Sequence, residues 1–232
     1  TGITDKTSGG TTRVSYAYTY DAANRVTTEV RTWASGASTD TLGYTYTNDN
    51  QLTGVTHSNG SFTGETFSYD ANGNRNSTGY VTATDNRLTT DGTYNYGYDS
   101  MGNEISRTEI SSGNKTLYAY DYNDVLIEVD SVVGGVTTVL ATYTYDVFDQ
   151  RIGRKEGSTT TWTLYDGSNP ILDFNASGTQ TARYLQGVAA VDVVLARETS
   201  GGAVAWYLPD RLDTVRDLVD NSGVVIDHVD YD

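Results

Sequence analysis

Tyrosine alternates with small or polar residues in short stretches along the whole chain, as in residues 16–20, 94–98 and 143–145. A period of two is typical of a β-strand, in which every second side chain lies on the same face of the sheet. Tyrosine and threonine, both frequent here, also favour strands over helices. The pattern therefore predicts strands that carry a row of tyrosine rings on one face.

Most of these strands run into an aspartate and a stretch rich in Asn and Gly, and a second strand-like stretch follows. Asp and Asn bond nearby backbone groups and tolerate a positive φ, which tight hairpins require. The sequence therefore predicts antiparallel hairpins, with turns at residues 23–24, 72–73, 101–102 and 221–223.

The hairpin unit repeats. It reads YDAANRV from Tyr20, YTNDNQL from Tyr46, YDANGNR from Tyr69, YDSMGNE from Tyr98 and YDVFDQR from Tyr145, with the variant YDYNDVL at residues 120–126. Such self-similarity indicates a repeat architecture, in which one supersecondary unit cannot bury its own face alone. We assign a structural role to the motif residues Tyr20, Asp21, Asn24, Tyr69, Asp70, Gly73, Tyr98, Asp99, Gly102, Tyr120, Asp121, Tyr145 and Asp146.

Two parts of the chain depart from this pattern. Residues 81–93 are interpreted as a shortened unit, and the repeat loosens from about residue 162. At residues 215–232 we expect strand, turn and strand, although a helix over 212–219 also fits the apolar spacing. We expect a YD-repeat hairpin array over residues 1–161 and, over 162–232, an end region of the repeats that continues the same sheet.

Composition limits the core and the partners. The chain has 19 Tyr but only 4 Phe, 3 Trp and 1 Met, so we expect a sheet with two partly wet faces and no thick aliphatic core. A net charge of −15 disfavours nucleic acid and anionic membranes as partners. Cysteine is absent, and no apolar run is long enough to predict a transmembrane segment. The chain starts and stops within the repeat pattern, so we expect a longer parent polypeptide.

The sequence offers no catalytic motif. His57 and His228 are far apart and lack metal-ligand spacing, and each is interpreted as a structural residue, His57 in a solvated turn and His228 on a strand. The acidic residues lie mostly in turns, where capping explains them better than glycoside hydrolysis. Calcium at residues 48–50 or 121–124, and glycan stacking on the tyrosines, are weaker alternatives. We expect no enzyme activity, no catalytic residue, no metal and no cofactor.

Six YD-type units, followed by RYLQG and WYLPDRLDTVRDLVDNSGVV, resemble the RHS/YD-repeat family of bacteria, which is related to the teneurin shell. The segment 206–216 is the most specific part, and it adds Asp210, Arg211 and Arg216 to the structural motif residues. One difference is Asp213, which stands where the family usually has Gly. The resemblance implies an all-β fold, an array of antiparallel hairpins in a continuous sheet that spirals into a hollow shell.

From this resemblance we expect a non-catalytic segment of a shell that encloses or presents a toxin or effector polypeptide. The partners would be further YD repeats of the parent chain or identical copies, and an encapsulated C-terminal toxin. The location would be extracellular or the bacterial cell surface. An extracellular adhesion module or self-assembling fibre, built from the same hairpins and able to contact glycans, is the alternative. No residue matches the aspartyl self-cleavage motif that such families carry downstream.

Overall fold

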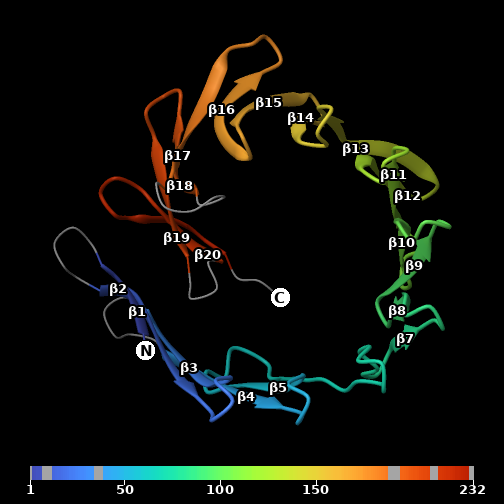
Figure 1. Ribbon diagram of the computed structural model, residues 1–232, viewed down its shortest axis with the longest axis vertical. Coiled ribbons are helices and arrows are strands. Elements are labelled where there is room, and N and C mark those ends of the chain that lie inside the picture. Colours follow the sequence, from blue (N-terminus) through green and yellow to red (C-terminus); the bar gives the residue numbers. More distant parts are fainter. Residues whose placement is uncertain (1, 7–11, 34–38, 188–193, 210–213, 230–232) are drawn as a thin grey trace. The chain divides into compact units, whose positions relative to one another are not determined.

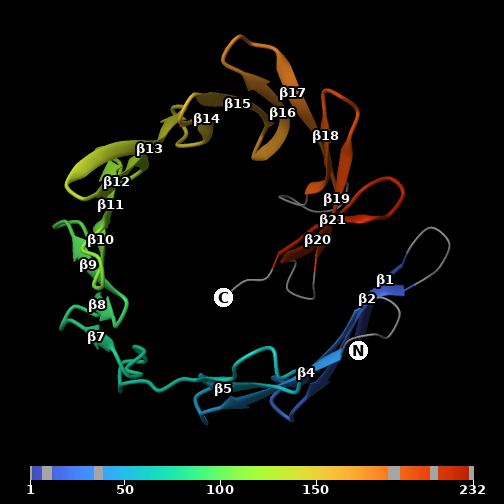
Figure 2. The same ribbon diagram turned by 180° about the vertical axis from the view of Figure 1, so that it is seen from behind.

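The computed structural model describes residues 2–6, 12–33, 39–187, 194–209 and 214–229, and these residues form strands and turns without a helix. The expectation of an all-β array of antiparallel hairpins is confirmed. Figures 1 and 2 show consecutive strands joined by short turns. Accordingly, no helix within the described ranges is long and apolar enough to cross a membrane.

The strands are numbered in chain order. They are β1 (Gly2–Lys6), β2 (Thr12–Tyr20), β3 (Val26–Trp33), β4 (Thr39–Tyr46), β5 (Leu52–His57), β6 (Glu65–Thr66), β7 (Tyr80–Thr82), β8 (Leu88–Asp91), β9 (Tyr94–Tyr98), β10 (Glu104–Glu109), β11 (Lys115–Tyr120), β12 (Leu126–Val133), β13 (Val136–Tyr145), β14 (Arg151–Glu156), β15 (Thr159–Asp166), β16 (Asn169–Asn175), β17 (Gln180–Gln186), β18 (Val194–Thr199), β19 (Val204–Pro209), β20 (Val215–Val219) and β21 (Val225–His228).

Hydrogen-bonded neighbours are always consecutive strands, β1 to β6 in one sheet and β7 to β21 in the other. One continuous sheet was expected, and the strands instead fall into two. The division follows β6, which has only two residues. The next hairpin, at the YDANGNR repeat, is reduced to a single bridge between Tyr69 and Arg75. A single bridge does not continue the backbone ladder from β6 to β7, so the two sheets are separate.

By their contacts, residues 1–77 and 204–232 form one compact unit, and residues 78–203 form a second. In the first unit, Val14, Tyr16 and Tyr18 alternate along β2 and bury one face of it. Tyr20, Val26 and Trp33 pack against this cluster. The alternation of tyrosines thus builds a buried sheet face, as the sequence predicted.

Few side chains are buried in either unit. Nine hydrophobic residues among those described are almost fully buried, and three of them are alanines. Because so little apolar surface is buried, packing contributes less to the stability of the fold than in a typical core, and hydrogen bonds contribute a larger share.

The two irregular regions fold as hairpins. Residues 82–88 form the turn of the shortened unit, as expected. β20 and β21 pair in antiparallel fashion across a turn at residues 220–224. The helical alternative for residues 212–219 is therefore wrong over Val215–Val219, where the backbone is a strand.

Gly153 shows how closely neighbouring strands pack. It lies in β14, opposite Trp162 of β15 and Thr144 of β13. A Cβ at this position would lie 2.6 Å from Cζ3 of the Trp162 ring and 3.1 Å from Cβ of Thr144. The absent side chain therefore lets the tryptophan ring lie against the backbone.

We predict that Gly153→Ala lowers the free energy of unfolding by about 1–3 kcal/mol, because the added methyl overpacks this contact. Urea denaturation measures the effect. Gly60→Ala is the matched control, since no atom outside its chain neighbours lies within 4 Å of the new Cβ. An equal loss in both variants would contradict this packing role.

Candidate functional site

The repeated feature of this chain is a seven-residue turn that runs from the tyrosine to the residue six positions later. Its end residues are paired in the ladder, as in Tyr20 with Val26 and Tyr98 with Glu104. Inside it, the second residue donates its N–H to the carbonyl of the sixth, and the fifth donates to the carbonyl of the second. The turns of this type found from the repeats are residues 20–26, 46–52, 69–75, 82–88, 98–104, 120–126 and 145–151.

In the turns that begin with a tyrosine, a side-chain oxygen at the second position holds the turn. Asp99 Oδ1 accepts the backbone N–H groups of Met101 and Asn103, both at 2.9 Å. Asp21, Asp70, Asp121 and Asp146 make the same pair of bonds in their turns. The carboxylate thus satisfies backbone donors that the bent chain leaves without a ladder partner.

The fifth position of the turn has a positive φ. Asn24 (62°), Gly73 (84°) and Gly102 (101°) occupy it, so these three motif residues lie where the repeat predicted a conformational demand. Asn50, Asn86, Asp124 and Asp149 occupy it in the other turns. Glycine, Asn and Asp are the residues that adopt this backbone region at least cost.

Three further turns of this kind lie where the sequence pattern loosens, at residues 174–180, 198–204 and 219–225. Their second residues are Asn175, Thr199 and Asp220, and their fifth residues are glycines with positive φ. The first two were not predicted from the YD units, because neither begins with tyrosine. The spacing of an Asp, Asn or Thr three residues before a Gly would have found them.

In every tyrosine repeat after the first, a hydrogen bond from the tyrosine joins its hairpin to the one before it, and we call this bond the tyrosine link. Tyr98 Oη donates to the carbonyl of Leu88 at 2.8 Å, and Tyr145 Oη donates to that of Leu126 at 2.8 Å. In each case the acceptor is the seventh residue of the preceding turn. The other links join Tyr46 to Val26, Tyr69 to Leu52 and Tyr120 to Glu104.

The tyrosine link lies where the backbone ladder between two hairpins ends. Between β12 and β13, for example, the ladder stops at Glu128 and Thr142, two residues short of Leu126. The carbonyl of Leu126 therefore has no backbone N–H opposite it, and the Tyr145 hydroxyl supplies the donor. An unpaired carbonyl at a partly buried position is costly, so this bond closes the gap between hairpins.

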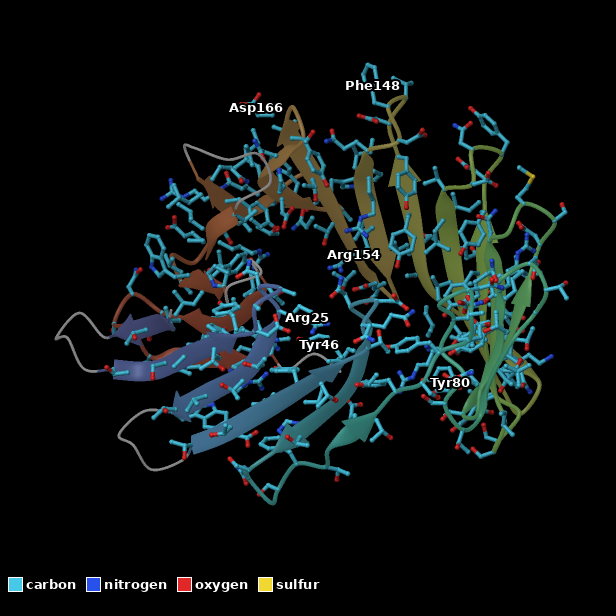
Figure 3. All side chains as sticks on the ribbon, turned by 60° about the horizontal axis from the view of Figure 1, so that its bottom comes forward. Arg25, Tyr46, Tyr80, Phe148, Arg154 and Asp166 are labelled. Carbon is cyan, nitrogen blue, oxygen red and sulfur yellow. The ribbon has the colours of Figure 1, made fainter. Side chains whose placement is uncertain are left out.

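The sixth residue of the turn reaches the next turn. Arg25 donates to the carbonyl of Thr47 at 2.9 Å and lies over the ring of Tyr46. Figure 3 labels these two residues next to each other. Arg87 donates to the carbonyl of Asp99 at 3.2 Å and lies over Tyr98. Asn103 also reaches the next turn, where it donates to the carboxylate of Asp124, and Gln150 donates to the carbonyl of Gly167 in the hairpin that follows. Consecutive turns are thereby held in register along the sheet edge.

Hydrogen bonds and burial in these turns shift the pKa values of the aspartates and tyrosines. The side chain of Asn103 and several backbone N–H groups lower the pKa of Asp99. The bonds from Arg25 lower the pKa of Asp21, and those from Asn74 lower the pKa of Asp70. Burial raises the pKa of the Tyr98, Tyr120 and Tyr145 hydroxyls, which therefore remain donors at neutral pH.

The three remaining motif residues belong to the chain's end region. Asp210 and Arg211 lie outside the described residues. Arg216 is in β20, where its carbonyl accepts the N–H of Val229. The thirteen motif residues of the earlier turns thus belong to one repeated arrangement. Arg216 lies outside that arrangement, within strand β20.

Both histidines pair with buried aspartates. His57 Nδ1 lies 2.6 Å from Oδ2 of Asp40, whose side chain is 1% exposed, and His228 Nδ1 lies 2.7 Å from Oδ1 of Asp217. His57 is thus an anchored residue at the end of β5 and not a solvated turn residue. Within the part of the chain that the structure describes, no group of three His, Asp or Glu side chains could hold a metal ion.

We predict that Tyr98→Phe lowers the free energy of unfolding by about 1 kcal/mol, because it removes one tyrosine link and keeps the ring. Chemical denaturation checks this value. Tyr122→Phe is the control, since the Tyr122 side chain is 93% exposed and makes no such link. A Tyr98→Phe variant as stable as the control would show that the link contributes nothing.

A second prediction concerns pH. The pKa of Asp99 is lowered in the folded state, so its carboxylate stabilises the fold above the ordinary value of 3.8. That contribution is lost as the pH falls through the lowered pKa. Asp99→Asn should keep the turn, because Asn175 makes the same bonds without a charge, but should weaken this pH dependence.

Asp99→Ala should lose the turn bonds at every pH. Urea midpoints at pH 7 and pH 3 for the wild type and both variants measure the difference. The assignment fails if Asp99→Asn loses as much stability as Asp99→Ala at pH 7.

Comparison with known proteins identifies the family to which these repeats belong. The family model described as Teneurin YD-shell matches residues 4–169. Among curated proteins, the chain is similar to the tRNA3(Ser)-specific nuclease WapA of Bacillus spizizenii, with 30% identity over 223 residues. The matched region is 88% of this chain and 8% of WapA, so the chain spans a small part of that protein's length.

Among solved structures, the chain is similar to TcdB2-TccC3-Cdc42, with 9% identity and a TM-score of 0.32 over 96% of this chain and 15% of the other. TcdB2-TccC3 gives 11% identity and a TM-score of 0.31 over 99% of this chain and 18% of the other. TM-scores this low do not identify a family, so the family of this chain is assigned from the Teneurin YD-shell model alone. Because that model covers well over half of the sequence and includes all seven turns found from the repeats, this chain belongs to the Teneurin YD-shell family, as its YD units predicted.

Proposed function

We propose that this chain is a non-catalytic wall segment of an RHS/YD-repeat shell, which encloses or presents a toxin or effector polypeptide outside the cytoplasm. The observation that carries the proposal is the tyrosine link, because the same joint attaches five successive repeat hairpins, those that begin at Tyr46, Tyr69, Tyr98, Tyr120 and Tyr145, each to the hairpin before it. A structure built on one repeated joint extends by adding units. In this proposal residues 1–161 are the repeat array and residues 162–232 are the end of the repeat region.

The sheet edges support further YD repeats as partners. In the described part of the chain, β1, β6, β7 and β21 each have a hydrogen-bonded neighbour on one side only. Edge strands offer unpaired N–H and C=O groups to another strand. Hairpins of a longer parent chain, or of an identical copy, carry the same backbone pattern and fit these edges.

The use of the carboxylates supports a non-catalytic role. Asp21, Asp70, Asp99, Asp121 and Asp146 are bound to backbone N–H groups of their own turns. A general acid or base needs a side chain that faces a substrate within hydrogen-bond reach. These five carboxylates are instead engaged in shaping the backbone, and we propose a structural role for all sixteen motif residues.

An adhesion or fibre module is the alternative, and the tips of the turns favour it. Met101, Tyr122, Val147 and Phe148 are 71%, 93%, 90% and 86% exposed on three consecutive YD hairpins. Phe148 points away from the strands in Figure 3. Apolar side chains this exposed are typical of contact surfaces.

The test uses the gene product that contains this chain. If the shell encloses a polypeptide, limited proteolysis should spare the enclosed segment in the wild type and cleave it faster in a Tyr98→Phe/Tyr145→Phe variant, which lacks two tyrosine links. Tyr122→Phe is the control and should protect like the wild type.

Equal cleavage of the segment with and without folded repeats would overturn enclosure. Sedimentation of the 232-residue chain at micromolar concentration tests the alternative. Concentration-dependent end-to-end assembly without protection of any segment would favour the fibre module, and a monomer that does not associate would contradict it.

A further inference from the structure

A polar cavity lies on one face of β14–β17. Its volume is about 170 Å³, and it is lined by Arg151, Gly153, Arg154, Thr161, Thr163, Asp173 and Tyr184. The side chains that line it share a face because Arg154 is paired with Thr161 in the ladder, and Thr163 is paired with Asp173. Trp162 and Leu164 alternate with the threonines and lie on the opposite face.

The acidic group of this cavity is already bound by neighbouring side chains. Asp173 is 4% exposed, and it accepts hydrogen bonds from Thr163 Oγ1 at 2.9 Å and from Tyr184 Oη at 2.6 Å. Nη2 of Arg197 lies 3.7 Å from the same carboxylate. A buried carboxylate with this many partners is a fixed part of the wall.

The two arginines of the cavity have no comparable partner. Arg151 lies over the ring of Tyr143 at 5.5 Å, and among the described residues no carboxylate lies within ion-pair distance of its guanidinium. Arg154 has one ion pair, to Glu156 at 3.4 Å, and both side chains of that pair are about half exposed. Such exposed pairs contribute little and exchange readily.

Arg151 and Arg154 bring two guanidinium groups to one cavity, in a chain of net charge −15 whose carboxylates are twice as many as its cations. Guanidinium binds a carboxylate through two parallel N–H···O bonds, and Thr161 adds a hydroxyl beside them. Asp173 in the wall, together with the net charge, disfavours a polyanion or a doubly charged group. The chemistry of the cavity therefore fits one singly charged carboxylate.

We propose that this cavity binds the carboxylate of an Asp or Glu side chain in a polypeptide that lies across this face of the sheet. Arg151 and Arg154 bind the two carboxylate oxygens, and Thr161 donates a further hydrogen bond. This inference rests on the proposed function, since it names a contact between the shell wall and the polypeptide that the wall encloses or presents.

The experiment follows the Arg Nε–H signals of the 232-residue chain by NMR, with N-acetyl-glutamate amide as the probe. We expect saturable shifts at Arg151 and Arg154, and binding weaker by about tenfold or more for N-acetyl-glutamine amide, which lacks the charge. A short peptide with one central Glu should bind more tightly than the single residue, because it also covers the sheet face.

Arg151→Gln and Arg154→Gln should each abolish the shifts of the remaining arginine. Both side chains are exposed, so neither change should affect folding, and circular dichroism checks this. Arg183→Gln is the matched control. Arg183 lies on the opposite face of β17, is 66% exposed and pairs with Glu198, so its loss removes one positive charge and should leave probe binding unchanged.

Equal shifts with the glutamine probe, or equal loss of binding in Arg183→Gln, would overturn the proposal. So would inorganic phosphate binding as tightly as the peptide, which would identify a site for free anions. The outcome is separable from the proteolysis test. Protection of an enclosed segment without probe binding would remove only the carboxylate site, and probe binding without protection would remove only the shell.

Discussion

The fold depends on the hydrogen bond that five of the repeat tyrosines donate to the last carbonyl of the preceding turn. Beside the seven-residue turn, the backbone ladder to the neighbouring hairpin stops two residues short of the last residue of the turn, as between Leu126 and Tyr145. The ring spans that gap and the hydroxyl satisfies the carbonyl. With nine almost fully buried hydrophobic residues among those described, the sheet has little else to hold its hairpins together at this edge.

The turn and the link are separable parts of the repeat. Tyr165 makes the link, to the carbonyl of Arg151, although the hairpin that it begins closes through residues 167–168 alone. Phe174 begins a complete seven-residue turn and has no hydroxyl to make a link. Since the short turn lies at the end of β15, the turn at the end of β16 lies at the opposite edge of the antiparallel sheet. From β16 onward, the seven-residue turns therefore lie at the edge opposite to that of the turns after β7, β9, β11 and β13.

The same logic accounts for the distribution of charge. Aspartates of the turns are bound to backbone N–H groups, and arginines such as Arg25 and Arg87 lie over tyrosine rings and bond to the next turn. Both kinds of charge therefore serve the repeated unit. Arg151 also lies over a tyrosine ring, that of Tyr143, but together with Arg154 it faces a polar cavity whose own carboxylate is bound elsewhere. The turn aspartates, Arg25 and Arg87 thus shape the sheet, whereas Arg151 and Arg154 are the groups that we propose for ligand binding.

The sequence by itself determined the elements and the turns. Alternating tyrosines, a capping Asp and a Gly or Asn at the position of positive φ are local requirements, and each is met within seven residues. These signals gave the all-β array, the turns at residues 23–24, 72–73 and 101–102, and the family. They missed the turns at residues 174–180 and 198–204, because these turns keep the glycine of positive φ but do not begin with tyrosine.

Only the tertiary structure decided what lies between hairpins. The acceptor of each tyrosine hydroxyl, the break after β6 and the pairing of His57 with Asp40 depend on ladder register between strands. The cavity at Arg151 and Arg154 depends on it as well, since its walls come from four strands. Register is set by bulges and ladder ends that no single unit encodes, because a shift of one residue would turn every side chain to the other face.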